Sequence, residues 1–217
     1  MKTTRFSLEG VARGGLALAM LTALVVAGPL PARAQSGGGC RLTGSATFSP
    51  GLTYAGNAAG ATSTFRFSGN LTLCASAPDS GPSTGTASIG NVFTDPATGY
   101  KWQEPIGQAQ GGCASSATRA HTLARWADGT LTLIEQETTS VSGQVVLTAR
   151  VVDRIVVAAS DPQPEQPAGL ELVTTRYAGG TVAGQLNVTG PTTAIVSCAT
   201  SGLGTLTLDG AVALATP

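Results

Sequence analysis

The sequence has 217 residues and carries little charge for its length. Only 11% of its residues are charged, whereas ordinary soluble domains have about 25%. Twelve basic and twelve acidic residues give a formal net charge of zero. A chain so poor in lysine and arginine is not expected to bind nucleic acid by neutralising phosphates. The 42% of hydrophobic residues exclude a disordered polar chain, and the single histidine excludes a multi-histidine metal centre.

Residues 1–34 have the features of a secretory signal peptide. Basic residues come first, an apolar run occupies Leu16–Gly28, and Ala32–Ala34 fits the small-x-small cleavage pattern. The apolar run is shorter than the ~20 residues that a membrane-spanning helix needs. We therefore expect a signal peptide at 1–34, a flexible leader at 35–39 and a single β domain at 40–217. The product would be secreted or extracellular, or associated with the cell wall, with no membrane span after signal removal.

Four cysteines lie in the expected mature chain, at Cys40, Cys74, Cys113 and Cys198. An even number of cysteines in an exported protein indicates disulfides, and no Cys-x-x-Cys spacing indicates a metal site. Four cysteines allow three connectivities. If a hairpin pairs the segments on either side of a loop centred on Asn57, Cys40 faces Cys74. We therefore predict the pairs Cys40–Cys74 and Cys113–Cys198.

Alternating apolar and polar residues predict strands, beginning with the segment 64–74. Its apolar face holds Phe65, Phe67, Leu71 and Leu73, and its polar face holds residues such as Arg66. A period of two is typical of a strand with one wet face.

The next strong local signal is a hairpin at Asp128-Gly129, a common two-residue turn between alternating runs. This turn would pair Trp126 with Leu131 and Ala124 with Leu133. The predicted pairing puts all four of these residues on one face, which we expect to face the core.

Further along the chain, residues 144–157 alternate with Val145 and Val157 on the same face. Strict alternation would place Asp153 on this apolar face, and a buried acid would be a candidate site. A bulge or bend at Asp153-Arg154 removes the conflict, and we favour it.

The last alternating segments are 182–188 and 206–214, and a proline-rich surface loop at 161–169 precedes them. After residue 35 we find no convincing 3.6-residue apolar period. The fold expected is all-β, a single antiparallel meander of about nine to eleven strands with two disulfides. Sequence leaves open whether it closes as a barrel or folds as a two-sheet sandwich.

Few residues offer catalytic chemistry. His121 is the only histidine and lies on an expected wet strand face, so no serine–histidine pair is indicated. Glu135 and Glu137 project from one strand face, a spacing compatible with a glycosidase acid pair. These two residues and Asp153 are the weak catalytic candidates; a solvated pair is the alternative. No metal or cofactor is expected.

Aromatic residues offer a weak candidate for ligand binding. Tyr100 and Trp102 follow a turn at 95–99 and alternate onto the same side of a strand. They could stack on a sugar or a peptide. The alternative is that they belong to the core, because a domain with so few aromatics tends to bury them.

Three segments carry a resemblance to a known group of proteins. Ala46–Thr53, Phe67–Cys74 and Arg125–Thr130 resemble segments of small secreted Thr/Gly-rich all-β proteins of actinobacteria. The resemblance covers most of the mature chain, but its motifs are turns, strand ends and a cysteine. It implies a bacterial, exported, disulfide-containing β domain and no functional residues, because the group has no established activity.

The absence of nucleophile–base pairs, metal clusters and cofactor loops in the sequence favours a binding protein over an enzyme. We expect an exported, non-catalytic β domain that binds a cell-envelope component, a small apolar ligand or another protein. If the fold is a barrel, its lumen could hold a small molecule. The two alternatives are a carboxylate-dependent, glycan-active hydrolase and a purely structural or adhesive surface protein. The structural or adhesive alternative predicts no concave pocket and no defined small ligand.

Overall fold

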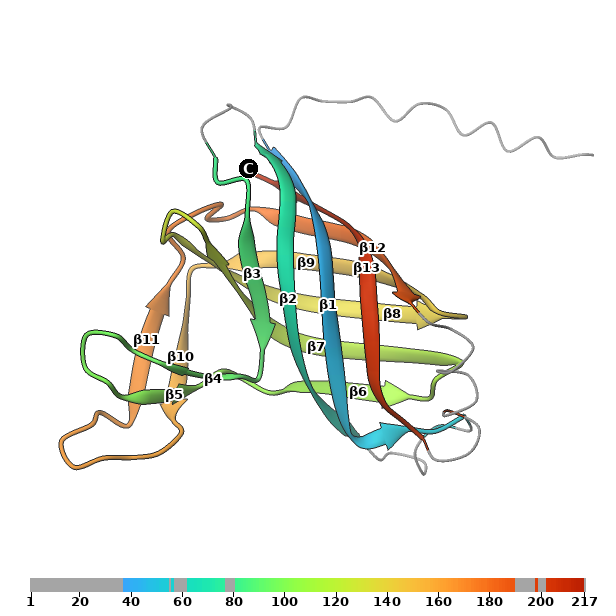
Figure 1. The fold of residues 1–217 in the computed structure, drawn as a ribbon, viewed down its shortest axis with the longest axis horizontal. Helices are drawn as coiled ribbons and strands as arrows, with labels where there is room; N and C mark the ends of the chain where they lie inside the picture. The colour runs from blue at the N-terminus through green and yellow to red at the C-terminus, as the bar shows by residue number, and fades with distance from the viewer. Residues whose placement is uncertain are drawn as a thin grey trace, which may run out of the picture. The chain divides into compact units, whose positions relative to one another are not determined.

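Thirteen strands account for most of the described chain and form two sheets (Figure 1). The computed structural model describes residues 37–54, 56, 62–76, 81–189, 198 and 202–216. The predicted signal peptide lies outside these residues. The strands are β1 (Gly37–Leu52), β2 (Ser63–Ser76), β3 (Gly85–Ile89), β4 (Val92–Thr94), β5 (Lys101–Gln103), β6 (Gly107–Gly111), β7 (Ser115–Trp126), β8 (Leu131–Val141), β9 (Gln144–Val152), β10 (Arg154–Ala159), β11 (Gly169–Val173), β12 (Thr181–Thr189) and β13 (Leu203–Ala215).

The larger sheet closes into a barrel. Its strands follow the order β1-β13-β12-β9-β8-β7-β3-β2, and β2 pairs back to β1. Neighbours in this ring are antiparallel. They follow one another along the chain except where β4–β6 and β10–β11 intervene, and β13 returns to pair with β1. The predicted antiparallel all-β meander is therefore confirmed, and of the two closures expected from sequence it is the barrel.

Two excursions of the chain leave the barrel and form the second sheet. The first departs after β3, forms β4 and β5, and returns as β6. Strands β3 and β6 share one barrel position, since β2 pairs with Ile89 of β3 through Phe67 and with Gly107 of β6 through Phe65. The second excursion departs after β9 and forms β10 and β11. Together they make the four-stranded order β11-β10-β5-β4. These short strands raise the count above the predicted nine to eleven.

The bend expected at Asp153 marks the start of the second excursion. Asp153 is exposed and forms a bend between β9 and β10, so its side chain does not lie on the apolar face. Its carbonyl oxygen accepts a hydrogen bond of 2.8 Å from the amide of Thr174. The bend confirms the interpretation that we favoured over a buried acid.

The hairpin after β7 forms at the predicted place but in a different register. The amide of Trp126 donates to the carbonyl of Thr130, which makes Ala127-Asp128-Gly129 a three-residue loop. Leu123 consequently pairs with Leu133. A shift of one residue exchanges the two faces of a strand. The prediction that Trp126 and Leu133 share one face is therefore wrong: Trp126 points into the barrel and Leu133 points out of it.

Both predicted disulfides are confirmed: Cys40 bonds to Cys74, and Cys113 bonds to Cys198. A β-bulge between Gly39 and Arg41 in the β1–β2 ladder helps bring the first pair together. The bulge also changes the position of Leu73, which has a φ of 52° and is 77% exposed instead of facing inward. An extra residue in one strand reverses the alternation beyond it.

Strand β1 begins earlier than the sequence suggested. Gly37, Gly38 and Gly39 pair with residues of β13, so three residues of the expected flexible leader belong to the barrel. A Cβ at Gly37 would lie 2.2 Å from the carbonyl oxygen of Leu214. Glycine at this position therefore permits a close approach between strands. Residues 35 and 36 lie outside the described residues.

The second sheet covers part of the outer face of the barrel. Leu123 and Leu133, which point outward, are completely buried, and Trp102 and Val157 from the second sheet are almost completely buried. Glu104, directly after β5, is 1% exposed and forms an ion pair of 2.8 Å with Arg125 of β7. In the described part of the chain, no helix is long and apolar enough to cross a membrane.

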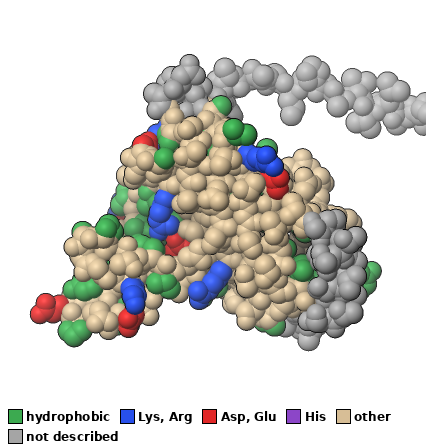
Figure 2. Space-filling model, viewed as in Figure 1, with side chains coloured by type: hydrophobic (Ala, Val, Ile, Leu, Met, Phe, Trp, Pro, Cys, Tyr) green, Lys and Arg blue, Asp and Glu red, His purple; other side chains and the backbone are tan. Residues whose placement is uncertain are grey.

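The rest of the barrel surface is mostly uncharged. Figure 2 shows few charged side chains on one face of the molecule. Several arginines pair with carboxylates across strands; Arg41 and Asp209, for example, lie 2.6 Å apart. Threonine and serine occupy many outward positions, as Ser45, Thr47 and Thr205 illustrate. Hydroxyl groups therefore supply much of the surface polarity that lysine and glutamate supply in ordinary domains.

Candidate functional site: a cavity in the barrel

One half of the barrel interior is filled with side chains. Trp126 closes this end, where its ring meets Tyr177 edge-on with centroids 5.6 Å apart. The Trp126 indole nitrogen donates a hydrogen bond of 2.9 Å to the hydroxyl of Thr132, which is itself fully buried. Val151 and Val182 pack into the same cluster. This end of the barrel is a conventional core.

The other half of the interior is hollow. A cavity of about 440 Å³ extends toward the end of the barrel that carries the β8–β9 turn. Tyr54, which is 67% exposed, lines the cavity near this end. Much of the wall is apolar and includes Phe48, Phe65, Leu147 and Leu186. Eight-stranded barrels are wide enough to hold one small ligand.

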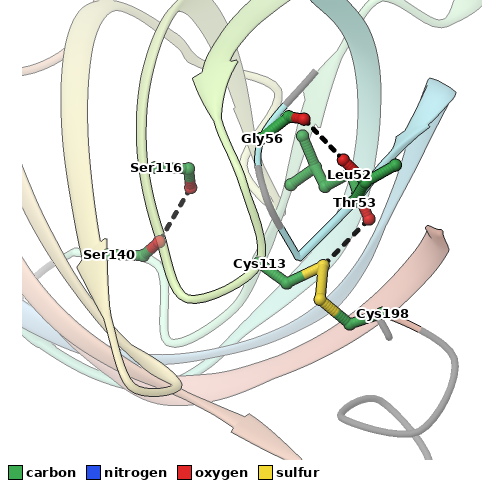
Figure 3. The surroundings of a disulfide bond; sticks show 7 residues. All are labelled: Leu52, Thr53, Gly56, Cys113, Ser116, Ser140 and Cys198. Atoms are coloured by element: carbon green, nitrogen blue, oxygen red, sulfur yellow. Dashed lines mark hydrogen bonds between the residues drawn. A yellow bond between two sulfur atoms is a disulfide. The ribbon is translucent and has the colours of Figure 1, made fainter. Parts of the chain in front are cut away.

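Strands β7 and β8 supply a polar wall within this mainly apolar cavity. Ser116 lies opposite Ser140, with their hydroxyl oxygens 2.7 Å apart (Figure 3). The next inward positions are Thr118 and Thr138, whose hydroxyl oxygens are 2.6 Å apart. All four residues are half-buried and line the cavity. They form a ladder of hydroxyl pairs along the wall, which we call the hydroxyl ladder.

Gln136 continues the polar wall deeper into the barrel. Its side-chain oxygen accepts a hydrogen bond of 2.8 Å from the hydroxyl of Thr122. Both residues line the cavity. The amide nitrogen of Gln136 carries two further donors. The polar wall therefore spans three successive inward positions on β8, at residues 136, 138 and 140.

The part of the cavity wall that the structure describes contains no strongly ionisable side chain. Among its described lining residues there is no Asp, Glu, Lys, Arg or His, and its two cysteines are joined to each other. General acid–base or nucleophilic catalysis needs such groups. The described residues of the cavity can surround an apolar molecule and form hydrogen bonds with any polar groups that it carries.

Glycines allow the aromatic side chains of the apolar wall to lie against the backbone. A Cβ at Gly44 or Gly69, which face each other across β1 and β2, would lie 2.5 and 2.7 Å from the ring of Phe67. A Cβ at Gly107 would lie 2.3 Å from the ring of Phe65. Each distance is far below van der Waals contact. Larger residues at these glycines would push the rings toward the lumen.

The Cys113–Cys198 disulfide lies at the end of the barrel that carries the β8–β9 turn and lines the cavity (Figure 3). The amide of Cys113 donates to the carbonyl of Thr53 over 3.1 Å, which ties the segment after β6 to the end of β1. The hydroxyl of Thr53 in turn donates to the carbonyl of Gly56 over 2.7 Å. These contacts fix part of the cavity rim to the barrel.

Glu135 and Glu137, the carboxylate pair singled out in the sequence, lie on the outer face of β8. Each forms an ion pair with an arginine of a neighbouring strand. Glu135 accepts a hydrogen bond of 2.7 Å from Arg150, and Glu137 lies 2.9 Å from Arg119. The hydrogen bond from Arg150 lowers the pKa of Glu135, with the positive charge of Arg150 adding to the effect. A lowered pKa favours the ionised form, the opposite of what a general acid needs.

The other sequence candidates lie in or beside the second sheet. Trp102 is only 2% exposed, and Tyr100 meets it edge-on with centroids 6.5 Å apart. Burial of Trp102 leaves its ring without a free face for stacking and matches the core alternative. Asp153 is at the exposed bend after β9. The structure therefore brings none of Glu135, Asp153 and Trp102 into the cavity.

The sequence reasoning missed the hydroxyl ladder. Residues 115–122 are polar on both faces, so alternation does not indicate which face points inward. The position of the charges does carry a signal. The charged residues of these two strands, such as Arg119 and Glu137, all lie at odd positions, whereas the even positions carry only uncharged residues. Uncharged polar positions opposite a charged face could have marked the lumen.

A buried carboxylate cluster was also missed. Glu104 accepts three hydrogen bonds. The donors are the hydroxyl of Ser88, the backbone amide of Asn91 and the guanidinium of Arg125, at 2.8, 3.1 and 2.8 Å. The Arg125 guanidinium also lies 4.6 Å from the ring centroid of Phe93. The cluster joins the first excursion to the barrel, which makes it a structural tie. No group of acids, histidines and cysteines in the described residues could hold a metal ion.

Comparison of the chain with protein-family models, with curated proteins and with solved structures found no match. The proposal for the function therefore rests on the cavity and its walls.

Proposed function

We propose that this protein is an exported, non-catalytic binding protein that holds a small, uncharged and mainly apolar molecule in the barrel. The observation that carries the proposal is the cavity of about 440 Å³ behind an apolar wall. Ligand sites commonly measure about 300–1,000 Å³ and combine apolar walls with a few polar groups. A purely structural barrel of this size would be expected to fill both halves of its interior.

The cavity volume bounds the ligand. A water molecule occupies about 30 Å³ in the liquid, so 440 Å³ corresponds to a molecule of on the order of 15 non-hydrogen atoms. The absence of charged side chains from the described wall disfavours a charged ligand. Burying an unpaired ion in apolar surroundings costs several kcal/mol or more.

The proposed setting is outside the cytoplasm, in or beyond a bacterial cell envelope. Two disulfides are consistent with an oxidising compartment. The signal-peptide features of residues 1–34 support the same location. An apolar ligand has low solubility in water, and an exported protein with an apolar cavity would carry or retain such a molecule there.

Neutral fluorescent probes test the proposal directly. N-phenyl-1-naphthylamine is an uncharged probe of about the right size that becomes fluorescent in apolar surroundings. Its sulfonated analogue, 1-anilinonaphthalene-8-sulfonate, adds a negative charge to the same skeleton. We expect saturable, one-to-one binding of the neutral probe and at least about tenfold weaker binding of the sulfonate.

Two adjacent residues of β8 provide a matched pair of variants. Ser140→Phe places a large ring in the cavity, whereas Thr139→Phe places the same ring on the outer face of the same strand. We expect Ser140→Phe to abolish binding of the neutral probe and Thr139→Phe to preserve it. Circular dichroism would check that both variants fold. Equal binding by the two variants, or no saturable binding by the unmodified protein, would overturn the proposal.

A further inference from the structure

We infer that the ligand is a neutral molecule that carries oxygen substituents along one edge, at a spacing matched to the hydroxyl ladder. This inference rests on the proposed function, because it specifies the chemistry of the molecule in the same cavity. It follows from the hydrogen atoms left over in the ladder, from the spacing of its positions and from the different chemistry of the facing wall.

The hydroxyl pairs retain donors after pairing with each other. In the pair Thr118–Thr138, one hydroxyl donates to the other across 2.6 Å. A hydroxyl group has one hydrogen and two lone pairs, so the accepting hydroxyl keeps its own hydrogen. The same holds for Ser116–Ser140. Each pair therefore offers one donor and spare lone pairs to a ligand without breaking the bond that orders it.

The spacing of these pairs is set by strand geometry. Successive inward residues on an antiparallel strand are separated by two residues, or about 6.8 Å. Ser140, Thr138 and Gln136 occupy three such positions on β8 and all line the cavity. A rigid ligand that uses two neighbouring positions therefore needs two oxygen atoms about 7 Å apart on the same edge.

The opposite edge of the ligand must be apolar. In the ring of eight strands, β1 and β13 lie across the barrel from β7 and β8. They contribute Ala46, Phe48, Leu206 and Leu208 to the cavity wall. These side chains offer no hydrogen bonds, and a buried polar group without a partner is costly. The two walls thus select a molecule with one oxygenated edge and one hydrocarbon edge, and they fix its orientation.

Two isomers of dihydroxynaphthalene separate edge recognition from general polarity. The hydroxyl oxygens of the 2,7 isomer lie on one edge, about 7 Å apart, which matches the ladder spacing. The 2,6 isomer has the same composition but places its hydroxyls on opposite edges. Both are measured by displacement of N-phenyl-1-naphthylamine. We expect the 2,7 isomer to bind about three to ten times more tightly, the effect of one additional hydrogen bond.

Valine substitutions remove one hydroxyl pair of the ladder and keep the shape of the side chains. The double variant Thr118→Val/Thr138→Val eliminates the middle position, so no two neighbouring hydroxyl pairs remain. We expect it to bind the two isomers equally and to bind N-phenyl-1-naphthylamine as tightly as, or more tightly than, the unmodified protein. Thr139→Val, on the outer face of β8, should keep the preference for the 2,7 isomer.

The outcomes separate this inference from the proposed function. Equal binding of the two isomers by the unmodified protein, with N-phenyl-1-naphthylamine still bound in the cavity, would overturn the inference and leave the proposed function standing. A preference for the 2,7 isomer that survives in the double valine variant would also overturn it. Failure of every neutral probe to bind would overturn the proposed function itself.

Discussion

Replacing Glu104 with glutamine tests the tie between the barrel and the second sheet. The carboxylate is 1% exposed and is surrounded by donors from Ser88, Asn91 and Arg125. Glutamine has nearly the same shape but has one oxygen and one NH₂ group. Whichever way the amide turns, its nitrogen faces a group that can only donate or that must reorient. The variant therefore loses at least one of the three hydrogen bonds and the negative charge that strengthens the others.

The expected loss of stability follows from these contacts. Hydrogen bonds to charged groups contribute about 1.5–3 kcal/mol, and an unpaired buried donor costs about 1–3 kcal/mol. Arg125 has a side chain that is 35% exposed, so water recovers part of its lost interaction. We expect Glu104→Gln to lower the free energy of unfolding by about 3 kcal/mol. The matched control is Glu135→Gln, whose arginine partner is 71% exposed and whose ion pair should contribute at most about 1 kcal/mol.

Urea denaturation, followed by tryptophan fluorescence with the disulfides intact, measures both variants. With a urea dependence of about 2 kcal/mol per molar, the Glu104 variant should unfold at a concentration about 1.5 M lower. A loss for Glu104→Gln within about 0.5 kcal/mol of the loss for Glu135→Gln would refute the reasoning. Such a result would mean that burial of this carboxylate contributes no more than a surface ion pair.

Three further predictions concern the disulfide, pH and a glycine. Replacing Cys113 and Cys198 together with alanine removes a bridge across 85 residues, and chemical denaturation should show a loss of about 4.5 kcal/mol in the chain-entropy description. Hydrogen bonds lower the pKa of several surface carboxylates below the unfolded value, so stability should be full above about pH 5 and fall as pH decreases toward 2. These carboxylates are Asp95, Asp128, Glu135 and Asp209. Urea midpoints measured across this range would check the direction, and Asp209→Asn should reduce the slope. Gly107→Ala should destabilise by about 1–3 kcal/mol and weaken probe binding, because its Cβ would displace the Phe65 ring, whereas Gly204→Ala, with no atom within 4 Å, should do neither.

Alternation predicted the barrel strands well because most of them have one apolar and one polar face. It failed where one extra residue in a loop or bulge changes which side of a strand faces the barrel interior. The loop at Asp128-Gly129 has three residues, which moves Leu133 to the outside, and the bulge at Leu73 exposes a leucine that alternation placed inside. A turn type and a bulge depend on contacts with strands distant in sequence, so the local alternation of residues does not predict them.

The alternation of residues also did not predict the second sheet or the cavity, for a related reason. Leu133 is fully buried on the outer face only because the excursions fold over it. The hollow half depends on inward positions occupied by Ser116 and Thr138, and these residues are equally common on wet faces. Which polar positions face inward becomes definite only when eight strands close, and closure is a property of the whole ring.

The pairing of β1 with β13 has a consequence for the order of folding. The first and last strands of the ring share twelve paired positions, from Gly37–Ala215 to Leu52–Leu203. The contacts that complete the barrel are thus among those with the largest sequence separation, and such contacts slow folding. Until β13 docks, β1 and β12 present unpaired edges that could pair with other chains. Docking of β13 is therefore the step most sensitive to aggregation, and mutations that weaken β13 should reduce folding yield as well as the stability of the closed barrel.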